Sequence, residues 1–484
     1  MQGSLRWLGA GIRGNSKVWL LVALGLLIWG WFDVRNRAHL NPDMPDSHRT
    51  DFSVYTCSAK ALRAGDDIYN APSPRGWYFL YPPAFLLVVL PVADLAYEDQ
   101  AFVWYLFSLL LLLATAYEGR RIARWDHQET GTMPTGTLQF LCIAAALAIL
   151  LPTLNCLQRG QVGAFLLYFL VLGLRVFLER SGVVSSFAAG IIVMLPAAVK
   201  IPLLLPSALL SMSLCLHAFR TKEPRSALGF VGGAVAGVVL WLFLVPSMYT
   251  GWDVNLAYLN SWVRETLVNQ KVGIGKGFEH YTMRNQSLTN GIDRFANFVD
   301  HVAFQGPEDE PSDFALFADR PMAMKSPVIR AIALAWRSIL ALALLWVVWK
   351  VGQDDDRLGM AAVFGLGCVG SLVLSPIAWG HHFMALLPAG LLVPFWLWSR
   401  GYQRGAVGFA CALAGLPLLH YCAFPWAPRM GILGIGMSVW LTLTCAAFAL
   451  HGTRWASLLD FDGARGLGWH GHSLWPIDGK GASS

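Results

Sequence analysis

A short polar stretch, Thr50-Asp51-Phe52-Ser53-Val54-Tyr55, holds the carboxylate that we interpret as the centre of this protein's chemistry. A carboxylate within hydrogen-bond reach of a hydroxyl group can remove its proton as a general base. Behind Asp51, apolar residues recur at helical spacing as far as Leu62, which predicts an amphipathic helix on a membrane surface. The same position also suits a helix cap, because an acidic side chain satisfies the free N–H groups of a first turn. Position alone leaves both roles open.

Other polar side chains stand inside or beside apolar runs, where ionisable groups are costly and usually functional. They are Asp66, Asp67, Tyr81, Arg159, Gln161, Lys200, Asn285, Gln286, Arg294, His381 and His382. The cations and hydrogen-bond donors among them are groups that hold a phosphate. Lys200 could instead extend its amine from a helix end to water. The adjacent histidines point in different directions on a helix, so they make a poor metal pair.

The elements that must position these residues are membrane-spanning helices. Of 484 residues, 55% are hydrophobic and 14% are charged, and several apolar runs approach the roughly 20 residues that cross a bilayer. The net charge of +6 comes from basic residues scattered between those runs, without the basic stripe of a nucleic-acid-binding protein. Eight cysteines form no CxxC pair, so neither a disulfide framework nor a zinc site is predicted. The composition predicts an all-α polytopic integral membrane protein.

Hydropathy predicts about twelve transmembrane spans. They lie near 18–31, 101–117, 137–153, 162–178, 183–199, 203–219, 228–249, 329–349, 358–375, 383–399, 406–422 and 430–450. The run from Tyr81 to Ala93 is too short to cross and predicts a re-entrant or interfacial piece. Basic residues between the spans, among them Arg220 and Arg404, place both chain ends on the cytoplasmic side.

This topology predicts one transmembrane domain, 1–452, and a cytoplasmic tail, 453–484. The first outer loop, 33–80, and the large outer loop, 250–328, lie on the far side, where the polar candidates also gather. A transporter or lipid flippase is the alternative of another class, but it would hold such residues at mid-membrane, on broken helices in two corresponding halves. The run Asp354-Asp355-Asp356 falls inside and predicts a solvated turn.

The order of the polar motifs resembles glycosyltransferase family 87. The resemblance covers about residues 15–400 and is carried by Asp51-Phe52, Gly65, Tyr69, Tyr81-Pro82-Pro83, Gln158-Arg159-Gly160-Gln161, Lys200-Ile201-Pro202, Asn285-Gln286-Ser287-Leu288 and Ser375-Pro376-Ile377-Ala378-Trp379-Gly380-His381-His382. No single motif is specific, whereas their order and spacing together are. The family's members are integral-membrane enzymes of the GT-C type, typified by mycobacterial mannosyltransferases that use polyprenyl-phosphate mannose.

The resemblance implies the inverting transfer of a hexose from a polyprenyl-phosphate donor to a hydroxyl of a lipid or glycan acceptor, at the outer face of a bacterial inner membrane. The family's general base, an aspartate of the first loop, corresponds to Asp51. Lys200 and one of His381 and His382 would then stabilise the charge that grows on the departing lipid phosphate. Because that leaving group is a monophosphate, no metal cofactor is expected.

Two features depart from the family's pattern. The pair Asp66-Asp67 offers a second carboxylate for the role of base, and the acidic insert Glu308-Asp309-Glu310-Pro311-Ser312-Asp313 matches nothing in the family. An inactive relative that only binds a polyprenyl lipid is therefore a further alternative.

Overall fold

The computed structural model describes residues 16–450 apart from 42–46, 131–132, 180–181, 265–284, 293, 297–326, 354–355, 376, 424–426 and 428–429. The acidic insert at 308–313 and the tail at 453–484 lie outside the described residues. Within the described part the chain is helical, and Asn285 and Trp379 form an isolated antiparallel bridge. The prediction of an all-α chain is confirmed.

The helices follow one another in two groups. The first half of the chain forms α2 (Ser16–Trp29), the π-helical turn η1 (Gly30–Val34), α3 (Arg35–Ala38), α4 (Phe52–Ala64), α5 (Ala84–Val89), η3 (Leu90–Val92), α6 (Tyr97–Thr130), α7 (Thr135–Arg159), α8 (Gly163–Glu179), α9 (Val183–Val199), η4 (Ile201–Leu203), α10 (Leu204–Thr221), α11 (Arg225–Val238), η5 (Val239–Leu244), α12 (Val245–Thr250) and α13 (Trp252–Trp262). The second half forms α16 (Pro327–Val351), α17 (Arg357–Val373), η8 (Gly380–Leu386), α18 (Leu387–Ser399), α19 (Gln403–Cys422) and α21 (Ile432–Leu450).

Eight helical segments of the described chain are long and apolar enough to cross a membrane. They are Tyr97–Trp125, Thr135–Arg159, Ile201–Thr221, Arg225–Thr250, Ala331–Val351, Gly380–Ser399, Gln403–Cys422 and Ile432–Leu450, and the shorter helices α9 and α17 are apolar as well. The polytopic membrane fold is therefore confirmed. Every predicted span coincides with a helical segment, while the count of twelve stays a prediction.

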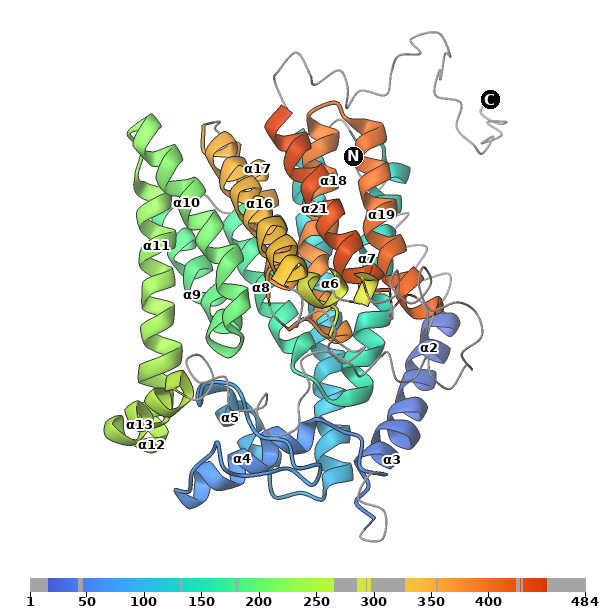
Figure 1. The fold of residues 1–484 in the computed structure, drawn as a ribbon, viewed down its shortest axis with the longest axis vertical. Helices are drawn as coiled ribbons and strands as arrows, with labels where there is room; N and C mark the ends of the chain where they lie inside the picture. Colours follow the sequence, from blue (N-terminus) through green and yellow to red (C-terminus); the bar gives the residue numbers. More distant parts are fainter. Residues whose placement is uncertain are drawn as a thin grey trace, which may run out of the picture.

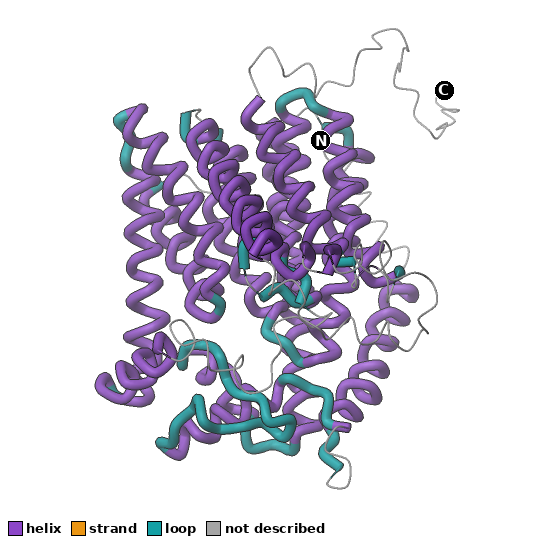
Figure 2. The backbone as a smooth tube through the Cα atoms, viewed as in Figure 1, coloured by secondary structure: helices purple, strands orange, loops and turns teal. Residues whose placement is uncertain are grey.

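The long helices stand side by side, and short elements gather at one end of them. Figure 1 shows α3, α4, α5, α12 and α13 together at the lower end of the bundle, and Figure 2 shows long loops at that same end. We call this the loop end. Lys200, between α9 and η4, turns the chain back at the end of its hairpin that faces α4 and α5. The α10–α11 connection lies at the opposite end.

Helix α4 is embedded in the loop end. Nine of its residues are buried, Ser53 and Ser58 included, and only positions near its C-terminus, such as Lys60 and Arg63, are exposed. The Phe52 ring stacks on Trp104 of α6 with centroids 5.0 Å apart, and Tyr55 meets Phe85 of α5 edge-on. The sequence pattern predicted that the polar face of α4 is exposed to water. This part of the prediction is wrong, because α5 and α6 cover faces of α4 that the pattern placed at the surface.

Asp356, at the opposite end, corrects another prediction. Its carboxylate caps α17 by accepting from the Gly359 amide at 2.9 Å, and it also accepts from Trp396 Nε1 at 2.8 Å and pairs with Arg400. The expectation of a merely solvated turn is wrong for Asp356, which ties α17 to α18. Asp354 and Asp355 lie outside the described residues.

Candidate active site

Asp51 is buried, with 3% of its side chain exposed, and is surrounded by donors. Arg159 donates from Nε to Oδ2 at 2.8 Å and from Nη2 to Oδ1 at 3.2 Å. Gln161 donates its amide to Oδ2, and Arg75 donates from Nη1 to Oδ1 at 3.0 Å. Arg159 and Gln161, which the sequence marked as binding residues, therefore hold the candidate base. Two guanidinium groups therefore lie against this buried carboxylate as counter-charges.

The side chain of Asp51 does not cap helix α4. The residue occupies the position before α4, but its side chain makes no bond to the first turn of the helix. Thr50 takes part of that role, because its Oγ1 accepts from the Phe52 amide at 3.2 Å. The alternative in which Asp51 merely caps the helix is wrong. Its carboxylate faces the end of α7 instead.

Gly160 brings the end of α7 against the start of α4. The Asp51 amide donates to the Arg159 carbonyl at 2.8 Å, and Gly160 adopts a left-handed conformation with φ of 66°. A Cβ at Gly160 would stand 2.7 Å from Cβ of Phe52 and 3.0 Å from Oγ1 of Thr50. Only glycine combines this backbone with so close an approach.

We expect Gly160→Ala to lower the free energy of unfolding by about 2–4 kcal/mol, the sum of left-handed strain and overpacking. Thermal unfolding of the purified protein in detergent measures the loss. Gly136→Ala is the matched control, because it lies in the same helix and its added methyl meets nothing within 4 Å. Equal stability of the two variants would contradict the close approach.

Tyr55 fixes which way the Gln161 amide points. Its hydroxyl donates to Gln161 Oε1 at 3.0 Å, which leaves the NH₂ group to face Asp51. Burial raises the pKa of Tyr55, so this phenol stays protonated and continues to donate. The tyrosine of the first-loop motif thus acts on the candidate base through Gln161.

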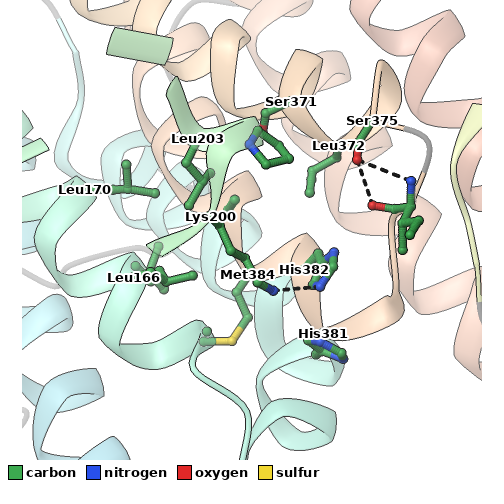
Figure 3. A pocket seen from close by; sticks show the side chains of 15 residues that line it. Leu166, Leu170, Lys200, Leu203, Ser371, Leu372, Ser375, His381, His382 and Met384 are labelled. Atoms are coloured by element: carbon green, nitrogen blue, oxygen red, sulfur yellow. Dashed lines mark hydrogen bonds between the residues drawn. The ribbon is translucent and has the colours of Figure 1, made fainter. Parts of the chain in front are cut away.

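A second polar group lies beside an apolar cavity. Lys200 Nζ is 2.7 Å from His382 Nε2, and it lies 5.6 Å from the centroid of the Tyr81 ring. The cavity has a volume of about 60 Å³ and is lined by Gly163, Leu166, Leu167, Leu170, Lys200, Pro202, Leu203, Ser371, Leu372, Ser375, Ile377, His381, His382, Met384 and Ala385. Figure 3 shows Lys200 reaching toward His382, with leucines along one wall.

Trp379 contacts both the residues around Asp51 and the residues around Lys200. Its ring stacks on His382 with centroids 6.4 Å apart and planes at 8°, and the Arg159 guanidinium carbon lies 5.7 Å from its ring centroid. The carboxylate of Asp51 and the amine of Lys200 are thus linked by contacts through Arg159, Trp379 and His382. The Asp51 carboxylate and the cavity that Lys200 lines therefore belong to one set of contacts around one indole, and a transfer between two bound molecules needs such proximity.

The residues at 285–294 support Trp379. The Asn285 side chain accepts from the Ala378 amide at 3.0 Å, Gln286 donates its backbone amide to the Ala378 carbonyl, and Arg294 donates to the Asn285 carbonyl. Asn285 and Gln286 are 2% and 1% exposed, so the Asn285-Gln286-Ser287 sequon is closed to glycosylation. These residues were predicted to bind substrate, and the structure places them behind the strand-like segment that carries Trp379.

Asp66 and Asp67 do not join the site. They follow the C-terminus of α4, about 20 Å from Asp51 by the rise of a helix of this length. Both are exposed, and Asp67 accepts from the Tyr69 amide and from Asn70 Nδ2. The structure therefore brings Asp51, Tyr81, Arg159, Gln161, Lys200, His381 and His382 together and leaves this second pair of carboxylates apart.

Arg75 is the contact of Asp51 that the sequence did not reveal. It lies in a Pro- and Gly-containing loop, where a basic residue is ordinarily solvated. Its neighbour Trp77 was noted only as one of several aromatic residues, although its ring meets Trp379 edge-on at 6.3 Å. Nothing in the local spacing distinguishes this arginine from those that face water.

Comparisons with known proteins identify the family of the chain. The sequence profile of glycosyltransferase family 87 matches residues 79–376. The polyprenol-phosphate-mannose-dependent alpha-(1-2)-phosphatidylinositol mannoside mannosyltransferase of Mycobacterium tuberculosis is 24% identical over 425 residues, which cover 85% of this chain and 83% of the relative. The enzyme of the same description from Mycolicibacterium smegmatis is 24% identical over 440 residues, covering 87% and 84%.

A crystal structure of ArnT from Cupriavidus metallidurans bound to undecaprenyl phosphate is a distant likeness, with a TM-score of 0.37 and 14% identity over 90% of this chain and 78% of that one. Asp51 precedes the segment that the family profile matches, so its role rests on the geometry described above. The matched segment spans more than half of the sequence, and the chain belongs to glycosyltransferase family 87.

Proposed function

We propose that this membrane glycosyltransferase moves a hexose, mannose in the first instance, from a polyprenyl-phosphate donor to a hydroxyl group of a lipid or glycan acceptor. The curated relatives, whose names specify a polyprenol-phosphate-mannose donor, support the choice of donor and sugar. The apolar wall of the cavity beside Lys200 suits an isoprenoid chain next to a phosphate.

The observation that carries the proposal is the series of contacts that links the Asp51 carboxylate to the Lys200 amine through Arg159, Trp379 and His382. Asp51 removes the proton of the acceptor hydroxyl while its oxygen attacks the anomeric carbon from the face opposite the phosphate. The bond from that carbon to the phosphate oxygen breaks, and the electron pair leaves with the phosphate. Lys200 and His382 stabilise the growing negative charge, and the configuration at the anomeric carbon inverts.

Reconstitution tests the proposal. Purified protein is incubated with polyprenyl-phosphate mannose or polyprenyl-phosphate glucose and with phosphatidylinositol mannosides or alkyl hexosides, and products are sought by mass spectrometry. We expect a hexose to move to an acceptor hydroxyl, and to do so equally in EDTA, because the leaving monophosphate is neutralised by protein cations. Absence of donor cleavage with every pair would overturn the proposal.

We further propose that the loop end faces the periplasm of a bacterial inner membrane. Asp67 lies exposed at the loop end, and Glu223 lies exposed in the α10–α11 connection at the opposite end. A membrane-impermeant maleimide is expected to label Asp67→Cys in intact cells, and to label Glu223→Cys only after permeabilisation, relative to the labelling of the parent chain. The reverse pattern would invert the orientation.

A further inference from the structure

The carboxylate of Asp51 is saturated with donors. A carboxylate offers about four acceptor positions. Arg159 fills two of them, Gln161 fills one and Arg75 fills one. An acceptor hydroxyl must hydrogen-bond to this carboxylate before it can give up its proton, so one of these donors has to leave first.

Arg75 is the donor placed to leave. Arg159 ends α7, and Gln161 is 5% exposed and held by Tyr55, so both are fixed by the bundle. Arg75 instead comes from a loop, and its side chain is 21% exposed against 15% for Arg159. It contacts Oδ1, the oxygen that Gln161 does not touch. Departure of Arg75 would open an acceptor position on that oxygen from the more exposed side of the carboxylate.

The loop that carries Arg75 is a compact turn. Ser73 donates its amide to the Trp77 carbonyl at 2.8 Å, and its Oγ accepts from the Trp77 amide at 3.2 Å. Gly76 adopts a left-handed conformation with φ of 70°, which closes the turn. Arg75 and Trp77 therefore lie on one small turn, with the guanidinium carbon of Arg75 3.9 Å from the centroid of the Trp77 ring.

Trp77 and Trp379 form an aromatic surface beside this position. Their ring centroids are 6.3 Å apart with planes at 67°, and the Trp77 side chain is only half-buried. Indole faces accept the apolar C–H side of a sugar ring, while charged groups next to them bind its hydroxyls. Trp379 also stacks on His382, which contacts Lys200, so a ring on this surface lies next to the cavity proposed for the donor.

We propose that Trp77 and Trp379 form the acceptor subsite, which takes a hexose ring, and that Arg75 guards Asp51 until the acceptor hydroxyl replaces it on Oδ1. This inference rests on the proposed function. The guard has a chemical purpose, because an open acceptor position on Oδ1 would activate water. The water would give its proton to Asp51, its oxygen would bond to the anomeric carbon, and the sugar would be lost by hydrolysis while the phosphate departs.

Two reactions of the full-length protein, measured side by side, test the inference. Hydrolysis is the release of free mannose from polyprenyl-phosphate mannose without an acceptor, and transfer is the formation of a disaccharide with n-octyl α-mannoside as the probe. For Arg75→Ala we expect the ratio of hydrolysis to transfer to rise at least fivefold. For Trp77→Leu we expect the KM for the octyl mannoside to rise about tenfold, because one of the two indoles of the acceptor subsite is lost.

Trp252→Leu is the matched control, because this indole is 51% exposed on α13, away from Trp379. Binding of the octyl mannoside, measured by saturation-transfer NMR, gives a readout that does not need turnover, and thermal unfolding shows whether each variant is folded. If Arg75→Ala lowers hydrolysis and transfer in the same proportion, Arg75 only positions Asp51 and the guard is overturned. If Trp77→Leu binds the probe as the parent does, or if the parent does not bind it, the hexose subsite is overturned. Failure of the parent to cleave the donor would overturn the proposed function itself.

Discussion

Asp51→Asn is expected to lower sugar transfer at least about a hundredfold, within the range attributed to a positioned general base. The amide keeps the shape of the carboxylate but cannot take a proton at neutral pH. It also removes the anion that Arg159 and Arg75 contact, which costs stability because Asp51 is 2% exposed. The rate is therefore measured as kcat at saturating donor and acceptor, on protein shown to be folded by thermal unfolding.

Asp33→Asn separates the loss of a base from the loss of an ion pair. Asp33 also lies beside an arginine and a glutamine, since it accepts from Arg37 Nε at 3.0 Å and from Gln158 Nε2 at 3.1 Å. It does not contact Trp379 or the cavity lining in the described structure. We expect Asp33→Asn to lose stability and to keep its kcat within about threefold. Full transfer by folded Asp51→Asn would remove Asp51 from the role of base.

The sequence predicted which candidate residues share one end of the fold, because charge bias fixes which helix ends share a side of the membrane. Arg159 and Lys200 end different helices, yet the predicted number of membrane crossings puts both on the same side as Asp51. The structure confirms that the three residues lie in one set of contacts. The number of crossings assigns each helix end to one side of the membrane, but it does not give the distance between two residues on that side. Asp66 and Asp67 share the loop of Asp51 and remain a helix length away.

Contacts between distant segments determine the burial of α4 and the position of Arg75, which the periodicity of the sequence did not predict. The apolar stripe of α4 predicted a helix with one wet face, but Ser53 lies against His48, whose Nε2 is 2.9 Å from its Oγ, and both are buried. Arg75 and Asp51 are 24 positions apart, with α4 and then an irregular loop between them. Such a contact produces no periodic pattern in the sequence, because it depends on the path of the loop and not on the residues that flank it.

Lys200→Met is expected to lower kcat/KM for the donor about a hundredfold or more, because it removes the cation nearest the departing phosphate, while the KM for the acceptor changes little. Methionine matches the length of the lysine stem and fills the same apolar wall beside Tyr81, so the expected loss of stability is small. Initial rates with polyprenyl-phosphate mannose at fixed octyl mannoside measure the effect.

Lys350→Met is the matched control for Lys200→Met. Its amine lies 5.8 Å from the centroid of the Trp346 ring, much as Lys200 lies over Tyr81, but it stands at the far end of α16, away from the cavity. A general effect of removing a lysine that stacks on an aromatic ring would lower both rates alike. Because the charge on a departing phosphate develops at one place only, we expect Lys350→Met to transfer sugar at the parent rate. Equal losses in the two variants would mean that Lys200 supports the fold and does not neutralise the leaving group.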